Sequence, residues 1–166
     1  PYDLDSHLFG PTETNEIFHT AYFDKNYYDQ QGNLIADLDL DDTDSYGPET
    51  TTIHNLKSAG VYSFYVQDYT NLYEKDSKDM SYSGARVQVY SGSNRIATFN
   101  VPTNKIGNVW HVFDYDAGTN SIIPVNTFSG TNDTDTLRGT LKPNINNYRE
   151  EMAIQTIIQG IRDNAK

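Results

Sequence analysis

The chain has 166 residues, a length that fits one domain with a short appendage rather than two full hydrophobic cores. Its 12 Lys and Arg residues against 23 Asp and Glu give a formal net charge of -11, which argues against nucleic acid as a partner. No apolar stretch approaches the roughly 18 residues of a membrane span, which argues against membrane insertion. Cysteine is absent, so disulfides, thiolate metal sites and a cysteine nucleophile are excluded.

Short runs of alternating or clustered apolar residues, separated by turn residues, fill the first three quarters of the chain. These runs predict strands at residues 2–9, 17–23, 34–40, 50–56, 61–69, 85–91, 95–101, 108–116 and 121–126. The composition includes 13 Tyr and 7 Phe, residues that favour pleated sheets. We therefore expect an all-β fold over residues 1–127, an antiparallel β-sandwich of jelly-roll or immunoglobulin-like type.

The character of the sequence changes after residue 127. Residues 128–147 are rich in Ser, Thr, Asn, Asp and Gly and nearly free of apolar periodicity, which is typical of a linker. Residues 148–166 place isoleucines and a methionine mainly at three- and four-residue spacings, which predicts an amphipathic C-terminal helix. The helix could pack on the sandwich or bind a partner.

Two segments far apart in the sequence place acidic or imidazole side chains at every second position: Asp3, Asp5 and His7, and Asp37, Asp39 and Asp41. Side chains two residues apart share one face of a strand, so the intervening Leu4, Leu38 and Leu40 should face the interior. If the two strands lie close together, crowding of their carboxylates is unfavourable unless a cation neutralises them or several of them protonate.

The oxygen donors of these segments favour Ca²⁺, which takes six to eight oxygen ligands. The candidate ligands are Asp3, Asp5, Asp39, Asp41, Asp42 and Glu49. Zinc is disfavoured because neither paired histidines nor cysteines accompany the carboxylates, and the spacing from Asp37 onward does not match an EF-hand. The alternative is that these carboxylates form a solvated acidic face.

Exposed aromatic side chains would support a second hypothesis, a carbohydrate-binding surface. The candidate ligand-binding residues are Tyr27, Tyr69, Tyr73 and Trp110. Trp110 is either such a platform or a core residue, and His111, which points the opposite way, is expected to be exposed. Residues 68–84 form the longest connection between predicted strands and are the expected binding loop.

Catalytic motifs are missing from the sequence. It contains no GxSxG elbow, no GxGxxG loop and no Walker pattern. We therefore expect a non-enzymatic protein without catalytic residues.

Five phrases in order carry a resemblance: DLDSHLFGP, DLDLDDTDSYGPETTTI, GVYSFYVQDY, SGARVQVYSGSNRIATFNVP and GNVWHVFDYD. From about Asp3 to Asn126 the chain resembles a family of bacterial β-sandwich domains found within large secreted, cell-wall or S-layer-associated proteins. The resemblance implies an extracellular or cell-surface accessory module, with neighbouring domains of a larger protein around it, and a Ca²⁺ role for the Asp-x-Asp and Asp-Asp-Thr positions. Its expected role is structural or adhesive, with a glycan or a host or cell-wall surface component as the possible partner.

Overall fold

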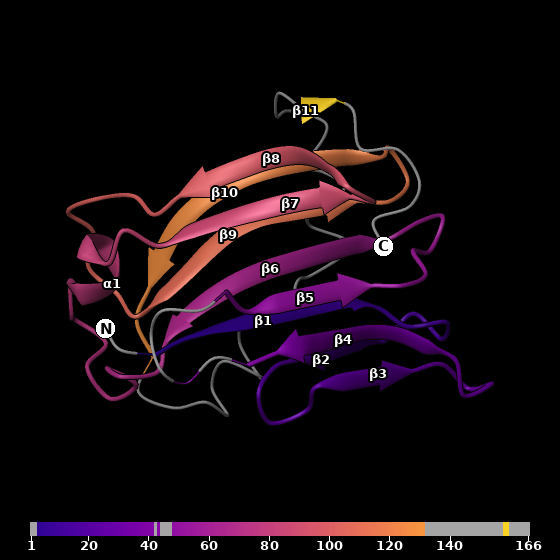
Figure 1. The fold of residues 1–166 in the computed structure, drawn as a ribbon, viewed down its shortest axis with the longest axis horizontal. Coiled ribbons are helices and arrows are strands. Elements are labelled where there is room, and N and C mark those ends of the chain that lie inside the picture. Colours follow the sequence, from indigo (N-terminus) through magenta and orange to yellow (C-terminus); the bar gives the residue numbers. More distant parts are fainter. Residues whose placement is uncertain (1–2, 42, 44–47, 132–157, 160–166) are drawn as a thin grey trace.

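The computed structural model describes residues 3–41, 43, 48–131 and 158–159 (Figure 1). Its elements are β1 (Leu4–Pro11), β2 (Ile17–Thr20), β3 (Asn26–Tyr28), β4 (Leu34–Leu40), β5 (Thr50–Ile53), β6 (Val61–Asp68), α1 (Asp79–Tyr82), β7 (Arg86–Ser91), β8 (Asn94–Asn100), β9 (Val109–Asp116), β10 (Ser121–Ser129) and β11 (Ile158–Gln159). Every strand pair in this described part is antiparallel. The predicted all-β class with antiparallel sheets is confirmed.

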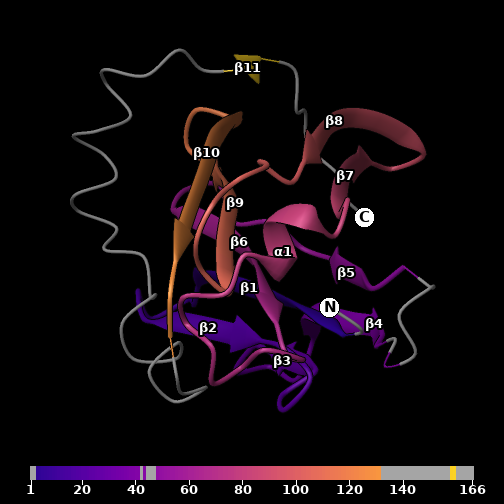
Figure 2. The same ribbon diagram turned by 90° about the vertical axis from the view of Figure 1, so that its left-hand side faces the viewer.

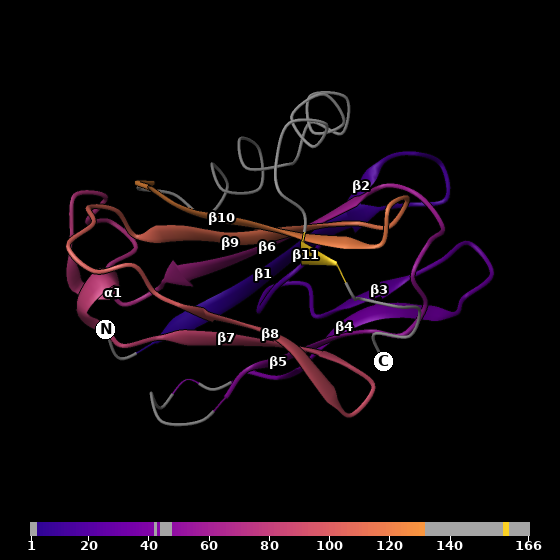
Figure 3. The same ribbon diagram turned by 90° about the horizontal axis from the view of Figure 1, so that it is seen from above.

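The strands pair into three sheets that lie in two layers. One layer is a six-stranded sheet in the order β11-β10-β9-β6-β1-β2. The other layer consists of the three-stranded sheet β3-β4-β5 and the hairpin β7-β8. Figures 2 and 3 show β4, β5, β7 and β8 on one side of the six-stranded sheet. The arrangement is sandwich-like, but its second layer is divided between two separate sheets.

Each predicted strand from the first to the ninth has a counterpart, and the differences lie at short elements. The sequence prediction missed β3, a three-residue strand in a polar stretch, and α1, a single helical turn within the predicted 68–84 loop. The predicted linker begins too early, because β10 continues to Ser129 and the backbone of Thr131 bonds to the side chain of Asn108. Within the described residues, no helix has the length and apolar character needed to cross a membrane.

The predicted C-terminal helix lies outside the described residues, with one exception. Ile158 and Gln159 form β11, which pairs with Ser121 and Ile122 of β10. These two residues are therefore in a strand, whereas the sequence pattern predicts helix for them.

The central strands of the six-stranded sheet are buried on both faces. Leu8 and Trp110 face the main core between the layers, whereas their chain neighbours Phe9 and Val109 belong to a smaller apolar cluster with Tyr65. Because both faces exclude water, polar residues that alternate with apolar ones along these strands are buried as well. This burial sets the electrostatics of the acidic segment in β1.

Candidate metal centre

A buried acidic cluster is formed by Asp5, Asp41 and Glu49, which come from three separate segments. Asp5 lies in β1, Asp41 directly follows β4, and Glu49 directly precedes β5. One carboxylate oxygen of each residue lies within 4.8 Å of those of the other two. The two layers therefore contribute to one group of carboxylates, which we call the β1–β4–β5 cluster.

The β1–β4–β5 cluster lies beside the part of β1 that β2 does not cover. β2 pairs with β1 only from Leu8 to Pro11. The backbone N–H of Ser6 donates to Glu49 Oε2 at 2.6 Å. This charge-assisted bond satisfies a backbone donor on the side of β1 that β2 leaves uncovered, and it fixes the Glu49 carboxylate against β1.

A β-bulge in β4 turns Asp41 into the cluster. Regular alternation would place Asp41 on the same face as the two aspartates before it, with Leu40 inside. Instead Leu38 pairs with Thr51 and Leu40 pairs with Thr50, so β4 has one extra residue at this point. One extra residue reverses the facing of every residue that follows it. Leu40 is consequently 51% exposed, and the prediction that it lies inside is wrong.

Asp5 occupies an unfavourable environment for a carboxylate. It is 3% exposed, and only burial and neighbouring charges, not a side-chain hydrogen bond, act on its carboxylate within the described part of the chain. Burial, together with the negative charges of Asp3, Glu49 and Asp41, raises the pKa of Asp5 to about 8. Burial also raises the pKa of Glu49 to about 7, against the opposing effect of its bond to Ser6. At neutral pH the cluster therefore favours either bound protons or a bound cation.

Further oxygen atoms of the cluster are available as ligands. Asp41 Oδ1 and Glu49 Oε1 are buried and have no hydrogen-bond partner among the described residues. Gln67 is the register partner of Asp5 on β6, is fully buried, and has no partner for either amide atom in the same part of the chain. The sequence analysis missed Gln67, although a glutamine within an apolar strand is itself a signal of a buried polar group. A donor set made only of oxygen suits a hard cation such as Ca²⁺.

The predicted metal ligands separate into three groups. Asp5, Asp41 and Glu49 meet in the cluster, and Asp3 lies close enough for its charge to raise the pKa values of Asp5 and Glu49. Asp39 lies elsewhere, in a second group of carboxylates. Asp42 lies outside the described residues.

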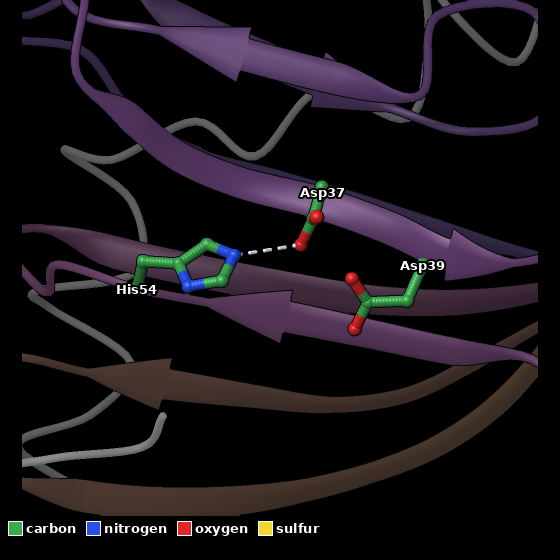
Figure 4. Close-up of side chains that lie close together, drawn as sticks. All are labelled: Asp37, Asp39 and His54. Atoms are coloured by element: carbon green, nitrogen blue, oxygen red, sulfur yellow. Dashed lines mark hydrogen bonds and ion pairs between the residues drawn. The ribbon is translucent and has the colours of Figure 1, made fainter.

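The second group comprises Asp37 and Asp39 of β4 and His54, which follows β5 (Figure 4). His54 Nε2 lies 2.9 Å from Asp37 Oδ1, and Thr52 donates a hydrogen bond to Asp39 Oδ2 at 2.5 Å. Burial raises the pKa of Asp37, and the bond from Thr52 lowers that of Asp39. Both carboxylates therefore already have a hydrogen-bond partner, and the side chain of His54 is 41% exposed.

The four predicted aromatic platforms differ in how much of each ring a ligand could reach. Trp110 is fully buried in the main core, which contradicts its candidacy as a binding residue. Tyr27 stacks on Phe18 with ring centroids 4.3 Å apart and interplanar angle 5°, so one of its faces is covered. Tyr69 and Tyr73 are 41% and 78% exposed. Tyr69 and Tyr73 are therefore the most exposed of the four predicted aromatic residues.

Histidine contacts beside these sites were not foreseen from the sequence. His7 Nδ1 and His19 Nε2 lie 2.9 Å apart, and His7 is fully buried. The prediction that His111 is exposed is wrong, because its ring stacks on Tyr65 and its Nε2 lies 2.7 Å from Asp114 Oδ1. Strand alternation indicates which face a side chain takes, but it does not indicate what covers that face.

Comparisons with protein-family models, with curated proteins and with solved structures gave no match for this chain. The functional argument therefore rests on the residues and their geometry.

Proposed function

We propose that this chain is a non-catalytic, calcium-stabilised structural module, and that the β1–β4–β5 cluster binds the ion. The observation that carries the proposal is Asp5, a carboxylate that is 3% exposed and lies beside Asp41 and Glu49, each of which has a buried oxygen without a hydrogen-bond partner in the described part of the chain. Several buried negative charges close together are strongly unfavourable, and a divalent cation would neutralise them together.

Calcium bound there would connect the two layers of the fold. Asp5 belongs to the six-stranded sheet, whereas Asp41 and Glu49 adjoin strands of the three-stranded sheet. An ion that binds the folded protein and not the unfolded chain adds its binding free energy to stability. Extracellular calcium modules bind in the range of about 10⁻⁴–10⁻³ M, and we expect an affinity of this order if the chain is a structural or adhesive unit of a secreted or surface protein of bacteria.

The test is thermal unfolding at pH 7.5 in CaCl₂ and in excess EDTA, with MgCl₂ as the ion control. At calcium a hundredfold above Kd, we expect stabilisation by about 2.7 kcal/mol, or an increase in Tm on the order of 10 °C. Asp5→Asn should abolish the response to calcium. Asp39→Asn is the matched control and should retain the response, because Asp39 lies in the other group of carboxylates. An equal Tm in CaCl₂ and EDTA would refute the proposal.

Exposed tyrosines favour a second candidate function, carbohydrate binding. Tyr73, 78% exposed, and Tyr69, 41% exposed, adjoin or lie within the long connection between β6 and β7. Aromatic faces stack on sugar rings, so retardation in polysaccharide affinity gels should be lost in Tyr73→Ala. Tyr90→Ala, which removes a tyrosine that is 43% exposed on β7, is the control. No retardation by any polysaccharide would reject this candidate.

A further inference from the structure

Lys25 contacts the β1–β4–β5 cluster directly. Its Nζ lies 2.8 Å from Asp41 Oδ2, and the side chains of the two residues are 45% and 15% exposed. Asp41 Oδ1, the other oxygen of the same carboxylate, is buried without a hydrogen-bond partner in the described residues. One oxygen of the Asp41 carboxylate is thus paired with an ammonium group, and the other is buried and open to a further ligand.

The backbone holds Lys25 in this place. Its carbonyl oxygen accepts a hydrogen bond of 2.8 Å from the N–H of Leu38 in β4, the strand that leads to Asp41. The turn before Lys25 is closed by reciprocal backbone bonds of 3.1 and 3.0 Å between Ala21 and Asp24. The ammonium group therefore approaches Asp41 from an ordered segment and needs little further ordering to form the ion pair.

The charges do not balance through Lys25 alone. The cluster contains three carboxylates with Asp3 as a nearby fourth, and the positive charge of Lys25 acts on Asp5 as well as on Asp41. A single ammonium group offsets part of this negative charge and leaves the rest for another cation. It also repels any divalent ion that binds to the same carboxylates.

We infer that Lys25 is a built-in counter-ion of the β1–β4–β5 cluster, one that supports the cluster in the metal-free protein and weakens its affinity for divalent cations. This inference rests on the proposed calcium site. Lys25 thereby sets the calcium concentration at which the module becomes fully stabilised, a role that sequence spacing alone does not assign to it.

The size of the effect follows from Coulomb's law. A single charge about 6 Å from a divalent ion, even screened as in bulk water, changes the dissociation constant by about tenfold. We therefore expect Lys25→Gln to bind calcium at least about tenfold more tightly than the unmodified chain. Without calcium, the same variant should unfold at a lower temperature, because the cluster has then lost its counter-ion.

The experiment is isothermal titration with CaCl₂ at fixed ionic strength, together with thermal unfolding in EDTA. Lys25→Arg keeps the charge and should bind calcium like the unmodified chain. Lys75→Gln is the matched control, because it removes a lysine from an exposed ion pair with Asp76, and it should change neither measurement.

The outcomes separate this inference from the proposed function. Tighter binding in Lys25→Gln together with lower stability in EDTA supports the inference. Equal or weaker calcium binding in Lys25→Gln overturns the inference while the calcium site stands. A third outcome refutes the site itself, and the inference with it. In that outcome, titration with CaCl₂ gives no binding heat for the unmodified chain or for Lys25→Gln, and Asp5→Asn does not alter the change in Tm on adding calcium.

Discussion

Asp39 and Asp41 lie two residues apart in the chain but belong to two groups of acidic side chains that differ in burial and in hydrogen-bond partners. The β1–β4–β5 cluster joins two layers, and its Asp5 is 3% exposed. In the other group, Asp37 and Asp39 lie near His54, whose side chain is 41% exposed. The comparison teaches that aspartates of one strand can enter a buried cluster, the proposed cation site, or a more exposed group with hydrogen-bond partners, and that burial and available partners decide between them.

The largest expected effect comes from neutralising Asp5. Because its pKa is raised to about 8, the ionised form destabilises the metal-free fold at pH 8, and Asp5→Asn should raise the free energy of unfolding in EDTA by several kcal/mol. Urea unfolding measures this change. Asp39→Asn is the control and should give no stabilisation, because Thr52 favours the ionised form of Asp39. A less stable Asp5→Asn in EDTA would contradict the contrast between the two groups.

The pH dependence of stability gives the next largest effect. The pKa of Asp5 is raised from 3.8 to about 8 and that of Glu49 from 4.5 to about 7, so the folded protein holds more protons than the unfolded chain between these values. Their contribution to stability is fully present below about pH 4 and is lost as the pH rises to about 8.

Urea titrations in EDTA at a series of pH values test this sign. We expect the combined variant Asp5→Asn with Glu49→Gln to lose stability less steeply across this range than the unmodified chain. Added CaCl₂ should also flatten the decline, because the ion replaces protons at the cluster. If stability declines equally steeply with pH in the unmodified chain and in the double variant, Asp5 and Glu49 are not the source of this pH dependence.

The smallest effect is expected at the exposed group. His54→Ala removes the partner 2.9 Å from Asp37, an interaction between a 41% exposed imidazole and a carboxylate of 14% side-chain exposure. Partly exposed pairs of this kind contribute about 1 kcal/mol or less, so the variant should unfold within about 1 kcal/mol of the unmodified chain at pH 6. Calcium should stabilise both proteins equally. A large loss of stability would show that this group carries a structural role comparable with that of the buried cluster.

The candidate site was partly predictable from the sequence. Alternation of aspartate with leucine indicated that Asp5 and Asp41 belong to acidic strands, and Glu49 was among the predicted ligands. The sequence could not separate Asp39 from Asp41, because the β-bulge that divides them is defined only by pairing with β5. Lys25 was not predicted, since its contact with Asp41 spans a turn and two strands.

The fold shows the same division between local and tertiary information. Strand periods and turn residues determined the all-β class and the approximate strand positions, because these depend on neighbouring residues and backbone preference. The tertiary structure alone decided that Trp110 is fully buried and that Leu40 is 51% exposed. It also decided that Asp5, Asp41 and Glu49 meet across two layers. The burial of a side chain and the meeting of side chains from different strands depend on segments distant in the chain. The periodicity of one strand does not indicate which segments pack against it.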